Sequence, residues 1–356
     1  MKSGYKQLGE YIEEVTRTNS DLKYGIDDVR GCSNTKKMMQ TRANLIGRTY
    51  EKFLVLQPGE FVFNRRTTRN GEKIGMAYND TDREYIFTED YVAFRVKDEC
   101  LSELLPDYLY LFFCRSEFDR YARYKSTGSA TEFFNWEDMC AVPFTAPDIE
   151  EQKKIVHAYK VIEDRINLKK RINEVLDDIA YTIYKDTFIN NNGRNWKSGT
   201  LSELLSVQYG KDHKELKNGL IPLYGSGGIM RNVEKSLYND VSVLIPRKGS
   251  LSNVMYVDEP FWSIDTMFYT KITKPYAAKF IYYFIRSQDL AGMDTGSAVP
   301  SMSSEIIHSM PLEIPDDDTL IEFDAHLEPI YKRIKSNNHE CMKLTESIGI
   351  LLSNIS

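Results

Sequence analysis

The most basic stretch of this chain, NRRTTRNGEK at residues 64–73, carries side chains suited to binding nucleic acid. Arginine and lysine can bind phosphates, and arginine and asparagine can also pair bidentately with guanine and adenine edges in the major groove. The alternative is a solvated hairpin turn around Asn70-Gly71. We predict DNA contact here, with five candidate residues: Arg65, Arg66, Arg69, Asn70 and Lys73.

Two glycine-containing stretches in the second half of the chain offer similar chemistry. LIPRKGSLSN at 244–253 corresponds to 64–73 in the repeat described below. YGSGGIMR at 224–231 fits neither dinucleotide-binding nor P-loop spacing, so we interpret it as a recognition loop in preference to a plain turn. The predicted DNA-binding residues of the second half are Arg231, Arg247 and Lys248.

No pattern in the chain predicts catalysis. PDIEEQKK at 147–154 has the outline of a nuclease metal site, but Asp148 followed by Glu151 is better explained as the capping box of a helix that begins after a proline. The five histidines form no H-E-x-x-H pattern, and the chain has no methyltransferase tetrapeptide, S-adenosylmethionine loop or helicase motor. We therefore expect no catalytic residue, no metal and no cofactor in this chain.

Charge is strongly segregated along the sequence. The net charge of −6 alone argues against nucleic acid, yet residues 30–73 hold ten basic and three acidic residues. Residues 211–248 hold seven basic and four acidic residues, whereas 294–328 hold nine acidic residues and no lysine or arginine. Two basic blocks therefore occupy corresponding parts of an acidic protein.

The chain repeats itself. TGSA occurs at 127–130 and again at 295–298, an offset of 168 residues that also relates Pro143 to Pro311. Further back Asp90 matches Asp265, and the second copy is shorter by about 25 residues. Because the order of matching segments is preserved, we interpret the chain as a tandem duplication.

Each copy has a mixed first part and a helical second part. Short β-branched and aromatic runs such as EFVFN and SVLIP, separated by Gly, Asn and Asp, predict strands followed by one or two helices. From Asp148 and from Thr319, apolar residues recur in steps of four and three, as in a coiled-coil seam, broken by Lys169, Asn173 and Asn337. Helices of this length need a partner for their apolar stripe, and we predict that the two pair antiparallel with each other.

Composition bounds the class of protein. A chain of 356 residues with 42% apolar and 28% charged residues has room for two ordinary globular domains. No apolar run approaches the roughly 18 residues of a membrane span, and the start of the chain lacks a secretory signal. Five scattered cysteines without C-x-x-C spacing indicate reduced thiols. We expect a cytoplasmic protein without membrane contact.

At this point the residues resemble a known family, the specificity (S) subunits of Type I restriction–modification systems. The resemblance covers essentially the whole chain. It rests on the paired TGSA…P…P segments, on the run FVFNRRTTRNGEKIGMAYND, and on YGSGGIMR followed by VLIPRKGSLSNVMYVDEPFWSIDTMFY. PDDDTLIEF departs from its counterpart PDIEEQKKI by lacking the basic residues, so the second helix can differ in how it docks partners.

The resemblance implies an α/β fold with two pseudo-symmetric target-recognition domains joined by two long antiparallel coiled-coil helices. The predicted limits are 1–147 and 193–317 for the domains, and 148–192 and 318–356 for the spacer helices. It also implies a non-catalytic subunit in which each domain recognises half of a bipartite site on double-stranded DNA. The spacers would dock two modification (methyltransferase) subunits, and restriction (motor and nuclease) subunits would join that core.

Two other classes of function stay open. One is a coiled-coil scaffold that binds proteins and touches no DNA, which leaves the matched basic blocks unexplained. The other is a single-chain nuclease or methyltransferase, which lacks the expected motifs.

Overall fold

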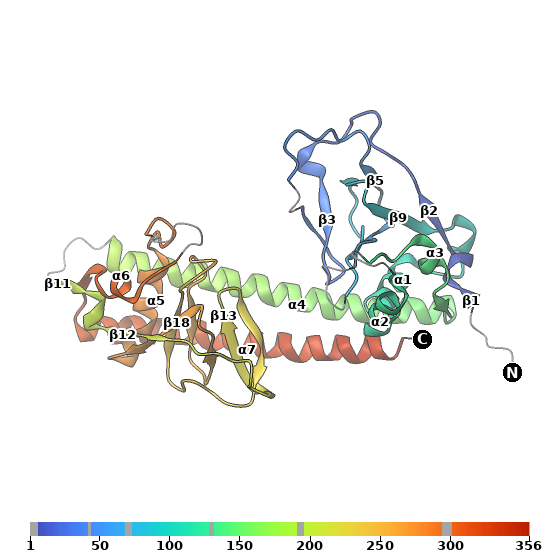
Figure 1. Ribbon diagram of the computed structural model, residues 1–356. Helices are drawn as coiled ribbons and strands as arrows, with labels where there is room; N and C mark the ends of the chain where they lie inside the picture. Colours follow the sequence, from blue (N-terminus) through green and yellow to red (C-terminus); the bar gives the residue numbers. More distant parts are fainter. Residues whose placement is uncertain are drawn as a thin grey trace. The chain divides into compact units, whose positions relative to one another are not determined.

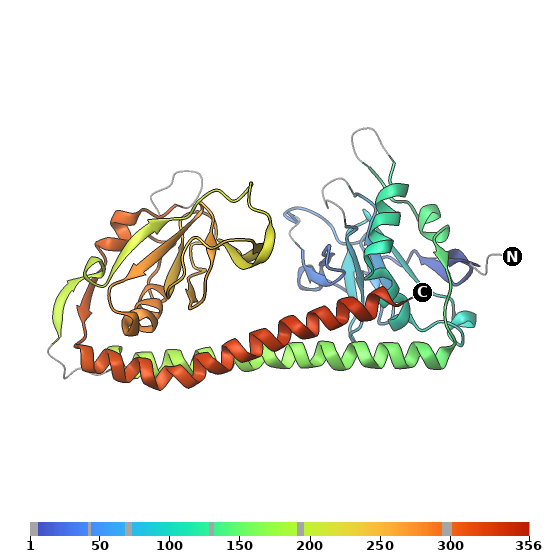
Figure 2. The ribbon, with the colours of Figure 1, turned by 90° about the horizontal axis from the view of Figure 1, so that it is seen from below.

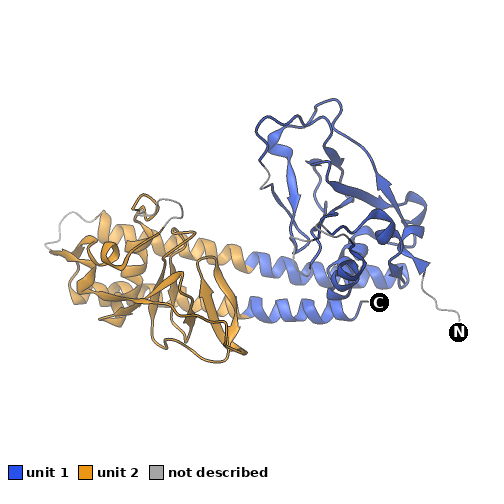
Figure 3. Cartoon of the chain, in the orientation of Figure 1, with its two compact units in different colours: residues 1–168, 340–356 blue, residues 169–339 orange. Residues whose placement is uncertain are grey.

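The computed structural model describes residues 6–41, 44–67, 73–127, 132–190, 196–293 and 301–355. The chain divides into unit 1, Met1–Leu168 with Glu340–Ser356, and unit 2, Lys169–His339 (Figure 3). Each unit combines strands, short helices and part of two long helices (Figure 1). Within these described ranges, no helix is both long and apolar enough to cross a membrane.

Both units contain the same four-stranded antiparallel sheet. In unit 1 its order is β2-β9-β6-β7, from strands β2 (Ile12–Val15), β6 (Phe61–Asn64), β7 (Met76–Tyr78) and β9 (Tyr91–Val96). In unit 2 the order is β12-β18-β15-β16, from β12 (Leu205–Tyr209), β15 (Ser242–Pro246), β16 (Met255–Val257) and β18 (Met267–Ile272). The matching strand order confirms the predicted duplication.

The central strand of each sheet is buried on both faces. Phe61 and Phe63 of β6 enter the core shared with the short helices, while Val62 enters a second core on the opposite face. In β15, Val243 and Leu244 divide in the same way between the helical core and the second core. Alternate residues of a strand point to opposite faces, so a continuous apolar run is what a strand covered on both sides requires.

The segments that cover the second face differ between the units. Between β2 and β6, unit 1 has the hairpin of β3 (Arg30–Cys32) and β4 (Met38–Gln40), and strand β5 (Leu54–Leu56), which pairs with β8 (Tyr85–Phe87). Between β12 and β15, unit 2 has the hairpin of β13 (Asn218–Gly225) and β14 (Gly228–Val233), and β13 also pairs with β17 (Trp262–Ser263). We call the chain between β2 and β6 the insert of unit 1 and the chain between β12 and β15 the insert of unit 2.

Short helices cover the face of each sheet that is opposite the insert. In unit 1 they are α1 (Pro106–Phe113), α2 (Ser116–Lys125) and α3 (Trp136–Cys140), and in unit 2 α5 (Ala278–Arg286) and α6 (Ser304–His308). All residues from Tyr108 to Phe113 are buried, as is Tyr283. The aromatic runs YLYLFF and FIYYF therefore serve mainly for packing.

Two long helices complete the fold. Helix α4 (Ile149–Tyr184) continues through a π-helical turn to Ile189, and α7 spans Asp317–Ser353. The Asp148 carboxylate accepts hydrogen bonds from the backbone N–H groups of Glu150 and Glu151, both at 3.0 Å, so Asp148 caps α4 as predicted.

Within each unit the two long helices lie side by side and run antiparallel (Figure 2). In unit 1, Arg165 forms an ion pair with Glu340. In unit 2, Lys169 donates to Asn337 at one end, while the rings of Tyr184 and Phe323 lie 6.3 Å apart at the other. The predicted fold of α/β domains with long paired helices is confirmed. Because the compact units divide the helices between them, the domain limits given above stay a prediction.

The polar residues that interrupt the seam bind one another in unit 2. The Lys169 ammonium donates to Asn337 Oδ1 at 3.1 Å, and Asn337 Nδ2 donates to Asn173 Oδ1 at 2.7 Å. Asn337 is 1% exposed. Buried polar pairs of this kind specify the register of paired helices, because any shift would leave them without partners.

Candidate nucleic-acid interface

The two predicted basic loops begin at equivalent points of the two units. In unit 1 the N–H of Phe134 donates to the carbonyl of Arg65 at 2.9 Å, and Arg66 forms a β-bridge with Phe133. In unit 2 the N–H of Met302 donates to the carbonyl of Arg247 at 2.9 Å, and Lys248 forms a β-bridge with Ser301. The backbone therefore equates Arg65 with Arg247 and Arg66 with Lys248, which confirms the predicted correspondence of the loops. We call these four residues the shared basic pairs.

A matching aspartate lies beside each shared basic pair. The Arg66 guanidinium forms an ion pair with Asp90 at 3.0 Å, and Arg247 Nη1 donates to the carbonyl of Asp265 at 3.3 Å. The Arg247 guanidinium also lies 5.3 Å from the ring centroid of Tyr209. An exposed ion pair such as that of Arg66 contributes at most about 1 kcal/mol, so a phosphate can compete for the guanidinium.

The predicted residues differ in exposure and in contacts. Lys73 and Lys248 are exposed, and Arg65 is partly buried. Arg231 contacts its own unit, because its Nη2 donates to the carbonyls of His213 at 2.8 Å and Leu216 at 3.0 Å. These bonds support the loop before β13, and DNA contact by Arg231 stays a prediction. Arg69, Asn70, residues 128–130 of the first TGSA segment and all of the second lie outside the described residues.

One basic residue of the first block is buried rather than on the surface. Lys36 is 3% exposed, and its ammonium forms an ion pair with Asp119 of α2 and donates to the carbonyl of Ile74 at 2.8 Å. Asp119 Oδ1 also accepts from the N–H of Ile74 at 3.1 Å. The three residues anchor the point where the basic loop 65–73 returns to the sheet.

Burial dominates the electrostatics of this anchor. Loss of hydration lowers the pKa of Lys36, and the Asp119 carboxylate opposes that shift only in part. Nothing in the local sequence distinguishes Lys36 from its exposed neighbours, because its partner is 83 residues away. The sequence-based prediction counted Lys36 within a basic block, and the structure removes it from the surface charge.

The described part of the chain offers no arrangement of three or more His, Cys, Asp or Glu side chains that could hold a metal ion. His308 instead accepts a hydrogen bond from the backbone N–H of Val207 at 3.0 Å, which is a structural role. All five cysteines are unpaired thiols.

Comparisons with known proteins agree with the sequence-based resemblance. Residues 30–178 match the family model described as Type I restriction modification DNA specificity domain. The MjaIX specificity subunit, a Type I restriction enzyme component of Methanocaldococcus jannaschii, is 22% identical over 292 residues, which are 70% of this chain and 68% of that protein. The HindI specificity subunit of Haemophilus influenzae is 23% identical over 155 residues, 43% of this chain, and the match spans only 33% of that protein.

A solved structure shares the fold. The crystal structure of the Type I restriction–modification S subunit from M. genitalium superposes with a TM-score of 0.54 at 13% identity, covering 98% of this chain and 94% of that one. The likeness in fold covers 98% of the chain, whereas the family model matches residues 30–178. The resemblance predicted from the residues is therefore confirmed: this chain carries a Type I restriction modification DNA specificity domain and is similar along its length to Type I specificity subunits.

Proposed function

We propose that this chain is the non-catalytic DNA-recognition subunit of a Type I restriction–modification complex and that each unit recognises one half of a bipartite site. Methylation, ATP hydrolysis and cleavage would belong to partner subunits, and this chain would need no cofactor of its own. The observation that carries the proposal is the pair of basic residues placed at one backbone position in both units, Arg65 with Arg66 and Arg247 with Lys248.

The geometry suits double-stranded DNA better than a protein partner. Two cations beside one another at a loop start can contact neighbouring phosphates, and the repeat of this arrangement in both units suits a ligand that itself repeats. The inserts next to the shared basic pairs differ in sequence and topology, as is required if the two units recognise half-sites of different sequence.

Replacing Arg65 and Arg66 together by alanine is expected to weaken DNA binding by the complex of this chain with its modification subunits. Each lost phosphate contact should make the slope of log affinity against log salt less steep by about 1. Hydroxyl-radical footprinting should show protection lost over one half of the site and kept over the other.

The matched control removes two exposed cations of unit 1 that lie outside the interface, Arg120 and Lys153, each bonded to a glutamate of its own helix. This control should keep the salt slope and the footprint of the unaltered complex. Equal loss of protection over both halves in the Arg65/Arg66 variant would contradict the assignment of one half-site to each unit. Absence of any DNA footprint in the unaltered complex would instead favour the coiled-coil scaffold.

We also propose that α4 docks a modification subunit. Val161, Leu168 and Val175 follow one another at seven-residue spacing on this helix, and more than half of each side chain is exposed. The corresponding positions of α7 are Pro329, Ser336 and Lys343, so the apolar stripe belongs to α4 alone. A row of exposed aliphatic side chains on a helix is suited to a protein interface.

Leu168→Glu is expected to weaken association with the modification subunit about tenfold or more, because a carboxylate would lose hydration at the centre of an apolar contact. The control is Lys170→Glu, which introduces a carboxylate two residues away on another face of α4 and should leave affinity nearly unchanged. Isothermal titration of modification subunit into each variant measures both. Similar affinities for the two variants would exclude this face as the docking site.

A further inference from the structure

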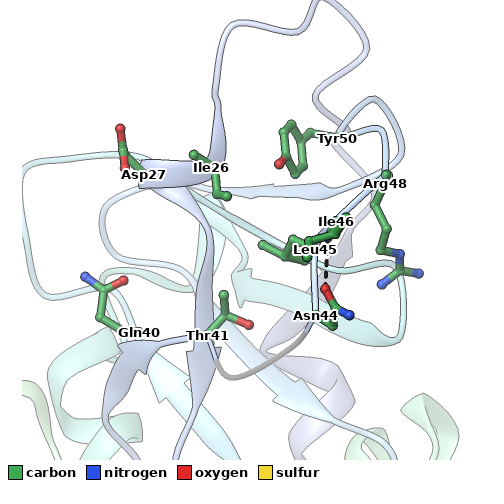
Figure 4. Close-up of a pocket in the computed structure, with 10 residues that line it drawn as sticks. Ile26, Asp27, Gln40, Thr41, Asn44, Leu45, Ile46, Arg48 and Tyr50 are labelled. Carbon is green, nitrogen blue, oxygen red and sulfur yellow. Dashed lines mark hydrogen bonds between the residues drawn. The ribbon is translucent and has the colours of Figure 1, made fainter. Parts of the chain in front are cut away.

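The insert of unit 1 contains a hollow, and among the described residues none of the basic loops lines it. Its volume is about 590 Å³, and its lining includes Asp27, Gln40, Asn44, Ile46, Arg48 and Tyr50 (Figure 4). These side chains come from the end of β4, from the segment that follows it and from the turn before β3. The hollow is thus built from the part of unit 1 that has a different topology in unit 2.

The rim of the hollow is tied to the shared basic pair. Arg48 forms an ion pair with Glu89 at 3.0 Å, and Arg66 forms one with Asp90, also at 3.0 Å. Glu89 and Asp90 are consecutive residues in the turn between β8 and β9. The hollow and the predicted phosphate contact therefore lie at the same edge of unit 1.

The side chains of the hollow suit base edges. Gln40 and Asn44 are exposed carboxamides, and among the described residues the Gln40 side chain has no hydrogen-bond partner. Asn44 Oδ1 accepts from the N–H of Ile46 at 3.1 Å, which orients the amide while its Nδ2 stays available as a donor. Carboxamides pair bidentately with adenine N6 and N7, and an aliphatic side chain such as Ile46, 90% exposed, can contact a thymine methyl group.

The same side chains suit phosphate poorly. Among the described residues, the carboxylates of Asp27 and Glu89 stand against one cation, Arg48, so this region repels an anion more than it attracts one. A carboxylate can, by contrast, accept a hydrogen bond from a base amino group. The chemistry therefore separates this hollow from the shared basic pair, where cations predominate.

Unit 2 places its own insert beside its own basic pair. In the turn of the β13–β14 hairpin, the carbonyl of Ser226 accepts from Asn253 Nδ2 at 2.8 Å, and Asn253 belongs to the loop that follows Lys248. In both units, therefore, the insert adjoins the shared basic pair. The inserts differ in sequence and topology between the units, whereas the basic pairs occupy the same backbone position. Two half-sites of different sequence have the same phosphate backbone but different bases. A constant basic pair beside a variable insert suits such a ligand.

We propose that the hollow of unit 1 recognises base edges of its half-site, with Gln40 and Asn44 as specificity-determining residues for an A·T base pair, while Arg65 and Arg66 contact only phosphates. This inference rests on the proposed function. It assigns base recognition to residues outside the basic loop, and it limits the predicted DNA contact of Arg65 and Arg66 to phosphates.

The test is selection of random-sequence DNA duplexes by the complex of this chain with its modification subunits, followed by sequencing of the bound fraction. Gln40→Ala and Asn44→Ala should each relax the preference at an A·T position in one half of the consensus, by roughly fivefold to a hundredfold. The salt slope should not change. Arg66→Ala should leave the consensus intact and make the salt slope less steep by about 1.

The control is Asn354→Ala, which removes another exposed carboxamide of unit 1 at the end of α7 and should alter neither quantity. A consensus unchanged in both hollow variants overturns the inference while leaving the proposed function in place. Relaxed specificity in Arg66→Ala likewise overturns it. A complex that enriches no split consensus at all refutes the proposed function first. Thermal unfolding of each variant verifies that lost selectivity is not lost folding.

Discussion

Lys36→Met lowers the free energy of unfolding of unit 1 by about 3–5 kcal/mol, the cost expected when one partner of a buried ion pair is removed. The Lys36 and Asp119 side chains are only 4% and 9% exposed. Methionine fills most of the space of the lysine stem but leaves the Asp119 carboxylate in the protein interior with its bond to the N–H of Ile74 alone. The remaining charge can regain hydration only if α2 separates from the sheet.

Hydrogen exchange of unit 1 measures this loss, because the amides of α2 and β7 report the opening of this region separately from unit 2. The matched control is Lys37→Met. Lys37 is the next residue, its side chain is 49% exposed, and its ammonium pairs with Glu163 at 2.5 Å. This exposed pair should contribute at most about 1 kcal/mol. Equal hydrogen-exchange protection in the two variants would mean that burial of the ion pair does not determine the loss of stability.

The pH dependence of the same pair has a defined sign. The pKa of Lys36 lies below its ordinary value of 10.5 because burial disfavours the ammonium. Unfolded unit 1 therefore binds more protons than folded unit 1 between the lowered pKa and 10.5, so the Lys36 contribution to stability rises with pH across that window. Subtracting the Lys36→Met curve from that of the unaltered chain should reveal this rise, and a difference that falls in the window would refute it.

The anchor also links stability to the proposed DNA contact. Ile74, which it holds, ends the loop that begins at the shared basic pair of unit 1. Asp119→Asn leaves the Lys36 ammonium in the protein interior without a carboxylate, so it should lower DNA affinity as Lys36→Met does. The end of the basic loop at Ile74 is thus held by a buried ion pair.

The features that the sequence predicted correctly are those encoded by spacing. The offset of 168 residues relates Phe133 to Ser301, and the backbone bridges place these two residues against Arg66 and Lys248. The seam positions and their polar breaks likewise follow from a period of 3.5, since each long helix has one partner and one register. A repeated sequence supplies its own alignment, so equivalent positions could be paired before any contact was known.

The features that it could not predict depend on contacts between distant residues. Lys36 and Lys37 are neighbours in one basic block, and only the position of Asp119 makes one buried and the other exposed. Arg231 ends a glycine-rich stretch, yet the carbonyls that it binds belong to the loop before β13. The hollow of unit 1 has no sequence motif, because its lining mixes polar, aliphatic and aromatic side chains that only the fold of the insert brings together.

Lys279→Met should lower the free energy of unfolding of unit 2 by about 2 kcal/mol, less than the loss expected for Lys36→Met. Lys279 of α5 is 2% exposed, and its ammonium donates to Asp324 Oδ1 at 2.7 Å and Glu328 Oε2 at 2.9 Å, both on α7. The side chains of these two acids are 29% and 45% exposed. Both carboxylates can turn toward water once the lysine is gone, so the remaining charges are not buried.

The acid response of unit 2 tests the same contact. The hydrogen bond from Lys279 lowers the pKa of Glu328 below its ordinary value of 4.5, with a smaller contribution from Lys332. The stabilisation is therefore present above about pH 4.5 and is lost as the pH falls through the lowered pKa. In Lys279→Met the loss of stability on acidification should be shallower, as followed by hydrogen exchange of α5.

Lys332→Met is the matched control for Lys279→Met, since Lys332 also pairs with Glu328, at 3.5 Å, but its side chain is 75% exposed. It should change the stability of unit 2 by less than about 0.5 kcal/mol. Together with Lys36 and Lys37, these lysines distinguish two explanations for the loss of stability when a lysine is removed. If the number of carboxylates bound by the lysine decided the loss of stability, Lys279, with two carboxylates, would matter more than Lys36, with one. If the hydration of the remaining carboxylate decides it, Lys36 must matter more, and the opposite order would reject that account.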